Sequence, residues 1–185
     1  MSAFTHALVR LDRERAVVLA TLDAMTPAQR DFRPASDAWS AADVTDHLAK
    51  AESGQIEIVR RQVEAGPARR SLGRPSAPRR WLIERIMRSG LRVRMPAAVA
   101  PRVAPTGVVF EASRAVLAGC GDAWRALAAA FPPELESVGV FAHPVAGPLT
   151  AAGTVCFAAA HLDHHRRQLQ RIHAAPGYPT STPPG

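Results

Sequence analysis

The sequence predicts an all-α protein, a four-helix bundle with a long crossover between its second and third helices. Four segments of bundle length carry apolar residues at helical spacing, with charged residues between them. Aromatic residues make up only 5% of the chain, while alanine and leucine supply much of its apolar content, and this composition favours helices over sheets. The helical pattern is interrupted over 66–108, after the second helix, and this segment is the predicted crossover.

The four long helices are expected over residues 3–25, 41–65, 108–131 and 150–174. Ser40 stands at the N-cap position of the second helix, and Asp43 complements the dipole of its first turn. Thr26 is a suitable N-cap for one short helical turn before the second helix. Gly119 and Gly121 weaken the middle of the third helix, which allows a break there.

The crossover carries the positive charge of the chain. Between Arg69 and Arg102 there are ten arginines and one acid, Glu84, which gives this stretch a net charge of +9. Because the whole chain carries +7, the remaining residues sum to −2. The basic character therefore belongs to one region, where it would attract anionic partners.

The connecting segments are expected to contain little regular secondary structure. The pattern of residues 81–95 predicts one short amphipathic helix closed at Gly90. The three prolines of 96–107 predict extended chain. The connector 131–150 contains several turn signals, and nothing in its pattern requires a sheet. The last long helix is expected to begin at Thr150 or one residue earlier.

The chain is expected to form one globular domain over 1–175, followed by a flexible, proline-rich tail at 176–185. Cys120 and Cys156 form neither a CxxC pair nor a disulfide framework, so a reduced, cytoplasmic setting is expected. No uninterrupted apolar stretch is long enough to cross a membrane, and no membrane association is expected.

His161 and His165 are the residues that point most directly to a function. Residues four apart lie one above the other on a helix, and this face otherwise carries apolar residues that should look into the bundle. Burying two imidazoles without partners costs a few kcal/mol. A metal ion held between them offsets that cost, as in helical zinc sites. Hydrogen bonds to the backbone or to carboxylates would offset it as well, so the spacing leaves both interpretations open.

A third histidine, His47, lies at the edge of the apolar stripe of the second helix. Three neutral imidazoles and an open position are typical of a catalytic metal site, although a single core histidine satisfied by hydrogen bonds is the alternative. Gln168 is on the same side as the pair and is a candidate to bond a ligand or a metal-bound water; Asp46 is a candidate partner behind the ligands. For both, a solvated polar residue is the alternative. His164 should point to the surface or rim. No metal role is assigned to His6, His143 or His173.

Three local motifs, taken in order, resemble the DinB-like superfamily of four-helix-bundle proteins. The first is the segment 32–52, FRPASDAWSAADVTDHLAKAE, in which a proline turn precedes a helix with a histidine inside it. The second is HPVAGPLT at 143–150, and the third is HLDHHRRQLQRI at 161–172, where glutamine follows the HxxxH pair by three residues. The order and spacing agree over residues 3–175, whereas the arginine-rich stretch corresponds only in its position.

The resemblance implies that one histidine of the second helix and two of the last bind a divalent metal ion. By position these are His47, His161 and His165. It also implies zinc, nickel or a similar first-row ion, with water or substrate completing the shell. Characterised members of the superfamily include thiol-dependent S-transferases, a mycothiol-dependent maleylpyruvate isomerase and metal-dependent hydrolases.

The expected function is therefore that of a metal-dependent enzyme of the S-transferase or hydrolase type, acting on a small-molecule substrate. The metal would lower the pKa of a bound water or of a low-molecular-weight thiol and so produce a nucleophile at neutral pH. Arginines of the crossover, Arg74, Arg79 or Arg80, would then lie over the site and attract an anionic thiol.

Two other functions are left open. In the first, the bundle has no catalytic activity and binds a metal ion or a small ligand, or pairs with a second copy of itself as a homodimer. Alternatively, the arginine-rich crossover would bind nucleic acid, since phosphate attraction needs only clustered cations. Nucleic-acid binding is the less favoured of the two, because Trp81 is the only aromatic residue in the basic stretch.

Overall fold

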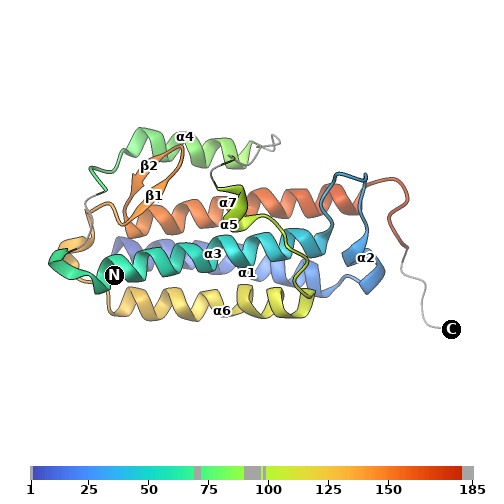
Figure 1. Cartoon of the computed structure of the whole chain (residues 1–185), viewed down its shortest axis with the longest axis horizontal. Coiled ribbons are helices and arrows are strands. Elements are labelled where there is room, and N and C mark those ends of the chain that lie inside the picture. Colours follow the sequence, from blue (N-terminus) through green and yellow to red (C-terminus); the bar gives the residue numbers. More distant parts are fainter. Residues whose placement is uncertain (1, 69–71, 90–96, 98, 181–185) are drawn as a thin grey trace.

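A computed structural model of the chain describes residues 2–68, 72–89, 97 and 99–180. Four long helices form a bundle: α1 (Ala3–Asp23), α3 (Ala41–Glu64), α6 (Phe110–Ala129) and α7 (Ala151–His173) (Figure 1). Each begins and ends within two residues of the range predicted from the sequence. The all-α, four-helix architecture is therefore confirmed.

The order of the helices around the bundle differs from that of a simple up-and-down bundle. The helix α1 packs against α7 and α6, and α3 also packs against α6 and α7. Figure 1 shows α3 in front, with α7 on one side of it and α6 on the other. In an up-and-down bundle the second and fourth helices would be diagonal to one another. Here they are neighbours, and this places α3 beside α7.

Side-chain caps fix where the principal helices begin. Ser40 Oγ accepts a hydrogen bond from Asp43 N at 3.1 Å, and the Asp43 carboxylate accepts one from Ser40 N at 2.8 Å, so the two residues form a capping box. Thr150 caps α7 by accepting from the backbone N–H three residues later at 3.0 Å. Thr26 caps the short helix α2 (Pro27–Asp31). These three caps confirm the helix starts predicted from the sequence.

The helix α6 runs without a break, although two glycines in its middle allowed one. Its twenty residues include both Gly119 and Gly121. A Cβ atom built on Gly121 would lie 3.0 Å from Nη1 of Arg15, which is a buried side chain of α1. The absence of a side chain at Gly121 thus gives the Arg15 guanidinium room to lie against α6, and the helix itself stays intact.

The crossover contains more structure than its composition suggests. After the 3₁₀ turn η1 (Gly66–Ala68) comes α4 (Ala77–Arg88), which packs along the outer side of α7 (Figure 1). This helix begins four residues before the predicted 81–95 helix, and proline in its first turn is compatible with that start. The predicted closure at Gly90 lies outside the described residues. Within the segment expected to be extended, Ala100–Val103 forms the short helix α5.

A small β-hairpin, which the sequence did not predict, precedes α7. After the 3₁₀ turn η2 (Pro133–Leu135), strands β1 (Phe141–His143) and β2 (Gly147–Leu149) pair antiparallel. Gly147 has φ +74°, a left-handed conformation that glycine adopts readily. The hairpin holds His143 against the beginning of α7, where its ring contacts Phe157 at a centroid distance of 4.4 Å.

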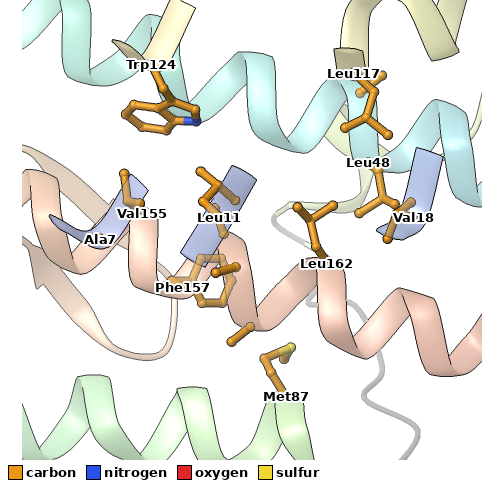
Figure 2. Packing of buried hydrophobic residues seen from close by; sticks show 14 of the residues in the cluster. Ala7, Leu11, Val18, Leu48, Met87, Leu117, Trp124, Val155, Phe157 and Leu162 are labelled. Atoms are coloured by element: carbon orange, nitrogen blue, oxygen red, sulfur yellow. The ribbon is translucent and has the colours of Figure 1, made fainter. Parts of the chain in front are cut away.

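Leucine, valine and aromatic side chains from all four long helices meet in one core. Leu11 and Leu48 are almost fully buried, as are Trp124 and Leu162 (Figure 2). Met87 of α4 joins them from the crossover, so this helix is part of the packed structure. Among the described residues, no helix is long and apolar enough to cross a membrane.

Part of the expected tail contacts the bundle. The ring of Tyr178 packs edge-on against Phe32 at 5.5 Å, and Gln29 Nε2 donates to the carbonyl of Pro179 at 2.9 Å. Residues 181–185 of the tail lie outside the described residues. The single-domain boundary at 175 stays a prediction.

Candidate metal centre

The fold brings together the three histidines singled out in the sequence. His47 lies in the second turn of α3, and His161 and His165 lie one turn apart on α7. One ring nitrogen from each lies within 4.8 Å of the other two. We call these three residues the three-histidine cluster. It exists because α3 and α7 are neighbours in the bundle.

The Nε2 atoms converge on one point. His161 Nε2 lies 3.1 Å from His47 Nε2 and 3.0 Å from His165 Nε2. Three nitrogens that each bind a tetrahedral ion at about 2.0–2.1 Å stand about 3.3 Å apart, and both distances from His161 Nε2 are close to this value. The fourth, open position of the tetrahedron would be left for a substrate or water.

Hydrogen bonds on the far side of two rings determine which nitrogen carries the proton. His47 Nδ1 is 2.8 Å from the carbonyl oxygen of Val103, which can only accept, so Nδ1 carries the proton and donates. His165 Nδ1 likewise donates to Gln168 Oε1 at 2.8 Å. Both Nε2 atoms therefore present lone pairs toward His161 Nε2. A single proton on that atom satisfies one of them, whereas a cation at the centre would accept all three.

The environment of the cluster favours neutral imidazoles. His47 and His165 are 4% and 5% exposed, and His161 is partly exposed. Burial lowers the pKa of His47, although the bond to Val103 opposes the shift. Burial, followed by neighbouring imidazoles, holds the pKa of His161 and of His165 well below the ordinary range. Neutral histidine is the form that binds metal ions, so the cluster is prepared for a metal ion at neutral pH.

Aromatic rings enclose the cluster on two sides. Trp39 lies parallel to His165, with ring centroids 6.3 Å apart, and lies 5.0 Å from the ring of His47. Phe157 stacks on His161 at 5.8 Å. These rings restrict the orientations of the imidazoles and give the site apolar walls. Trp39 belongs to the first of the three sequence motifs, but neither aromatic residue was predicted to line the site, because a tryptophan before a helix and a phenylalanine within one are ordinary core residues.

The expectation that His164 lies at the surface or rim is wrong. His164 is only 7% exposed, because α4 covers that side of α7. Its Nδ1 donates to the carbonyl of Met87 at 3.2 Å. The position about a third of a turn from the pair was estimated from helix geometry, but the helix that covers it lies in the irregular crossover.

The remaining candidate residues take different positions. Gln168 supports His165, as described above. The carboxylate of Asp46 is buried, yet it binds Lys50 and the backbone N–H of Thr106 rather than an imidazole. The second partner of His47 is thus a backbone carbonyl, which has no signature in the sequence.

The described contacts of Arg79 and Arg80 are with the hairpin and with the beginning of α7. A Cβ atom on Gly147 would lie 3.8 Å from Arg79, and one on Gly153 would lie 3.3 Å from Arg80. Arg80 also lies 3.5 Å from Glu84, and Arg74 is exposed. None of these contacts places an arginine on the three imidazoles.

Comparison with known proteins agrees with this architecture. The solved structure of YfiT from Bacillus subtilis, described as a probable metal-dependent hydrolase with an unusual four-helix bundle topology, is similar with a TM-score of 0.64. The match covers 95% of this chain and 89% of that chain at 16% sequence identity, and this level of identity establishes the fold alone. No curated protein matches. The sequence model of the DinB superfamily matches residues 10–169, a range that includes all three histidines of the cluster, and the chain therefore belongs to the DinB superfamily.

Proposed function

We propose that this protein is a divalent-metal-dependent enzyme that uses the three-histidine cluster to activate a nucleophile. The observation that supports this best is the convergence of three Nε2 atoms, two of which are fixed as lone-pair donors by Val103 and Gln168. A set of neutral nitrogens to which the described part of the chain adds no carboxylate ligand suits a first-row divalent ion, and we propose zinc or nickel.

When bound, such an ion acts as a Lewis acid and makes a coordinated nucleophile available at neutral pH. The residues of the chain would hold the ion and shield its ligands from water. His47 approaches from α3, and the pair on α7 approaches from the other side, so that the ligand set spans two helices. Trp39 and Phe157 exclude water from the flanks of the imidazoles, and a less polar surrounding strengthens charge interactions at the site.

We propose a small-molecule substrate, with hydrolysis or transfer of a low-molecular-weight thiol as the reaction. Both reactions need the same open coordination position and differ in the nucleophile that occupies it. The description of YfiT as a probable metal-dependent hydrolase supports the hydrolytic alternative. The basic crossover supports the thiol alternative, because an anionic thiol would be attracted to it. A homodimer remains a prediction.

Metal content tests the site directly. Elemental analysis of protein purified without a metal-chelating tag should give one equivalent of a divalent ion per chain. The His47→Ala variant should lose it, whereas His6→Ala, which changes an exposed histidine of α1, should keep it. Retention of the ion by His47→Ala, or its absence from the unaltered protein after reconstitution with zinc and nickel, would refute the proposed site.

Turnover tests the reaction class. Esters, amides and electrophiles should be screened with and without a panel of cellular thiols, using the metal-loaded protein and the His161→Ala/His165→Ala double variant. Hydrolysis without thiol would assign a hydrolase, and thiol-dependent conjugation would assign an S-transferase. A metal-loaded protein that turns over none of these substrates would favour the non-catalytic alternative, in which the bundle only binds the ion or a ligand.

A further inference from the structure

The end of the crossover is fastened to α3 next to His47. The short helix α5 (Ala100–Val103) packs on α3, and the carbonyl of Val103 accepts the hydrogen bond from His47 Nδ1. The following residues, up to Thr106, continue along the same helix. The segment 100–106 therefore forms part of the surroundings of the three-histidine cluster, although it belongs to a different region of the sequence.

Two side chains of α3 hold this segment. Lys50 Nζ donates to Thr106 Oγ1 at 2.5 Å and to the carbonyl of Ala104 at 3.3 Å. The Asp46 carboxylate accepts from the backbone N–H of Thr106 at 2.7 Å and from Lys50 Nζ at 2.8 Å. We call this set of four hydrogen bonds the α3 clamp.

The α3 clamp lies where it can hold the Val103 carbonyl against the ring of His47. Asp46 is 2% exposed, so its charge depends on these partners in place of water. Lys50 bonds Ala104, and both Lys50 and Asp46 bond Thr106, so the clamp fixes the residues one and three positions after Val103. Since the chain is short between these points, holding residues 104 and 106 also holds the Val103 carbonyl at its distance from the imidazole.

We propose that Asp46 and Lys50 are positioning residues for the metal site, and that closure of the α3 clamp and metal binding stabilise each other. This inference rests on the proposed function, because it requires an ion at the three-histidine cluster. The Val103 carbonyl keeps the proton of His47 on Nδ1 and leaves Nε2 free for the ion. When the segment detaches, the ring loses that restraint and either nitrogen can carry the proton.

The coupling is reciprocal. If a closed clamp raises the affinity for the ion, a bound ion must favour the closed clamp by the same factor. Loss of a hydrogen-bond partner behind a metal ligand typically lowers metal affinity by about 10–100-fold. The clamp should therefore act on metal binding through His47, even though neither of its side chains touches the ion.

Metal affinity is the first test. The dissociation constant of Zn²⁺ should be measured by competition with a chromophoric chelator for the unaltered protein and for Asp46→Asn and Lys50→Met. Both variants should bind about tenfold more weakly. Lys50→Arg, which keeps a donor, should recover part of the loss. The matched control is Glu57→Gln, which removes an exposed i,i+4 pair with Arg61 on the same helix and should leave the affinity unchanged.

Lysine acylation gives a second readout that needs no clamp variant. Lys50 is the only lysine, so a peptide-level mass measurement after acetic anhydride treatment reports the freedom of this one amine. Zn²⁺ should slow acylation of Lys50 severalfold in the unaltered protein and should have no effect in His47→Ala. The N-terminal amine serves as an internal reference for reagent consumption.

The outcomes separate this inference from the proposed function. If the unaltered protein binds no ion, the proposed function fails and the coupling fails with it. If it binds Zn²⁺ with equal affinity in the clamp variants, or if Zn²⁺ leaves the acylation rate of Lys50 unchanged, the coupling is refuted while the metal site stands.

Discussion

Two buried polar groups link α3 to other helices of the bundle: one is an ion pair, and the other is the neutral three-histidine cluster. Five residues after His47, Glu52 points about 140° away around the helix and toward α1 and α6. There its carboxylate forms an ion pair with Arg15 of α1 and accepts from Trp124 Nε1 of α6 at 3.1 Å. The three-histidine cluster, on the side of α7, contains neutral rings whose lone pairs face one another.

A buried polar group is stable only when each of its charges and lone pairs has a partner. The Arg15–Glu52 group contains its own countercharge, since the positive and negative partners are both supplied by the chain. The three-histidine cluster contains acceptors and a single shared proton, and a cation from outside is the component that we propose it binds. The first group is expected to respond to loss of a partner, and the second to addition of one.

The largest expected effect comes from breaking the ion pair. Arg15→Met leaves the buried carboxyl of Glu52 without its partner, which should lower the free energy of unfolding by about 3–5 kcal/mol. Urea unfolding with a chelator present measures this. The double variant Arg15→Met/Glu52→Leu removes both charges and should recover part of the loss, because Glu52 Oε2 has no described hydrogen-bond partner even in the intact pair. A single variant within 1 kcal/mol of the unaltered protein would contradict a desolvated pair.

Acidification should destabilise the fold through His143, a buried histidine of the hairpin that lies outside the three-histidine cluster. Burial lowers the pKa of His143 to about 4, and its Nδ1 accepts from the backbone N–H groups of Val145 and Ala146. The unfolded chain therefore binds more protons between pH 6.5 and 4, so stability is complete above this window and is lost as the pH falls through it. The loss from this residue amounts to about 3 kcal/mol.

The check is a series of urea unfolding curves at several pH values, recorded without metal. His143→Gln should flatten the pH dependence within this window, whereas His173→Gln, at an exposed position at the end of α7, should not. An unchanged slope in His143→Gln would show that the ring is not held neutral by the fold.

Metal addition should stabilise the three-histidine cluster by a comparable amount. An ion that binds only the folded state contributes about 2.7 kcal/mol at a concentration one hundred times its dissociation constant. Thermal unfolding with increasing Zn²⁺ should show a rising midpoint in the unaltered protein and in Arg15→Met, and a constant one in His47→Ala. A metal-dependent midpoint in His47→Ala would place the ion elsewhere.

The smallest expected effect is at the hydrogen bond behind His165. Gln168→Leu removes the acceptor of His165 Nδ1 and should weaken metal binding by about tenfold, or about 1.4 kcal/mol. Gln168→Glu keeps an acceptor oxygen and should retain most of the affinity. Chelator competition distinguishes the two variants, and equal affinities in all three proteins would mean that Gln168 does not orient the ring.

Much of this arrangement could be predicted from the sequence because its determinants are local. Apolar spacing and the caps Ser40 and Thr150 place the long helices, and the spacing of His161 and His165 places them on one face. His47 was a candidate third ligand from its place at the edge of the apolar stripe, and the family resemblance favoured it over the other interpretations that spacing left open. The structure brings the three together, and their role as metal ligands stays a proposal.

The features that escaped prediction depend on contacts between distant segments. The Val103 carbonyl is backbone, so no residue type marks it as the partner of His47. His164 is buried because α4 covers α7, and neither the start nor the docking of α4 follows from an arginine-rich composition. The pairing of Asp46 with Thr106 joins residues 60 positions apart, and only the folded crossover brings them into contact.

The adjacency of α3 and α7 has a consequence for biosynthesis. Because His161 follows His47 by 114 residues, a growing chain carries one member of the cluster long before the other two leave the ribosome. Nascent α1, α3 and α6 can begin to associate without them. Docking of α7 is then the step that creates the complete three-histidine cluster, so under the proposed function an ion would meet its full ligand set only in chains that have finished folding.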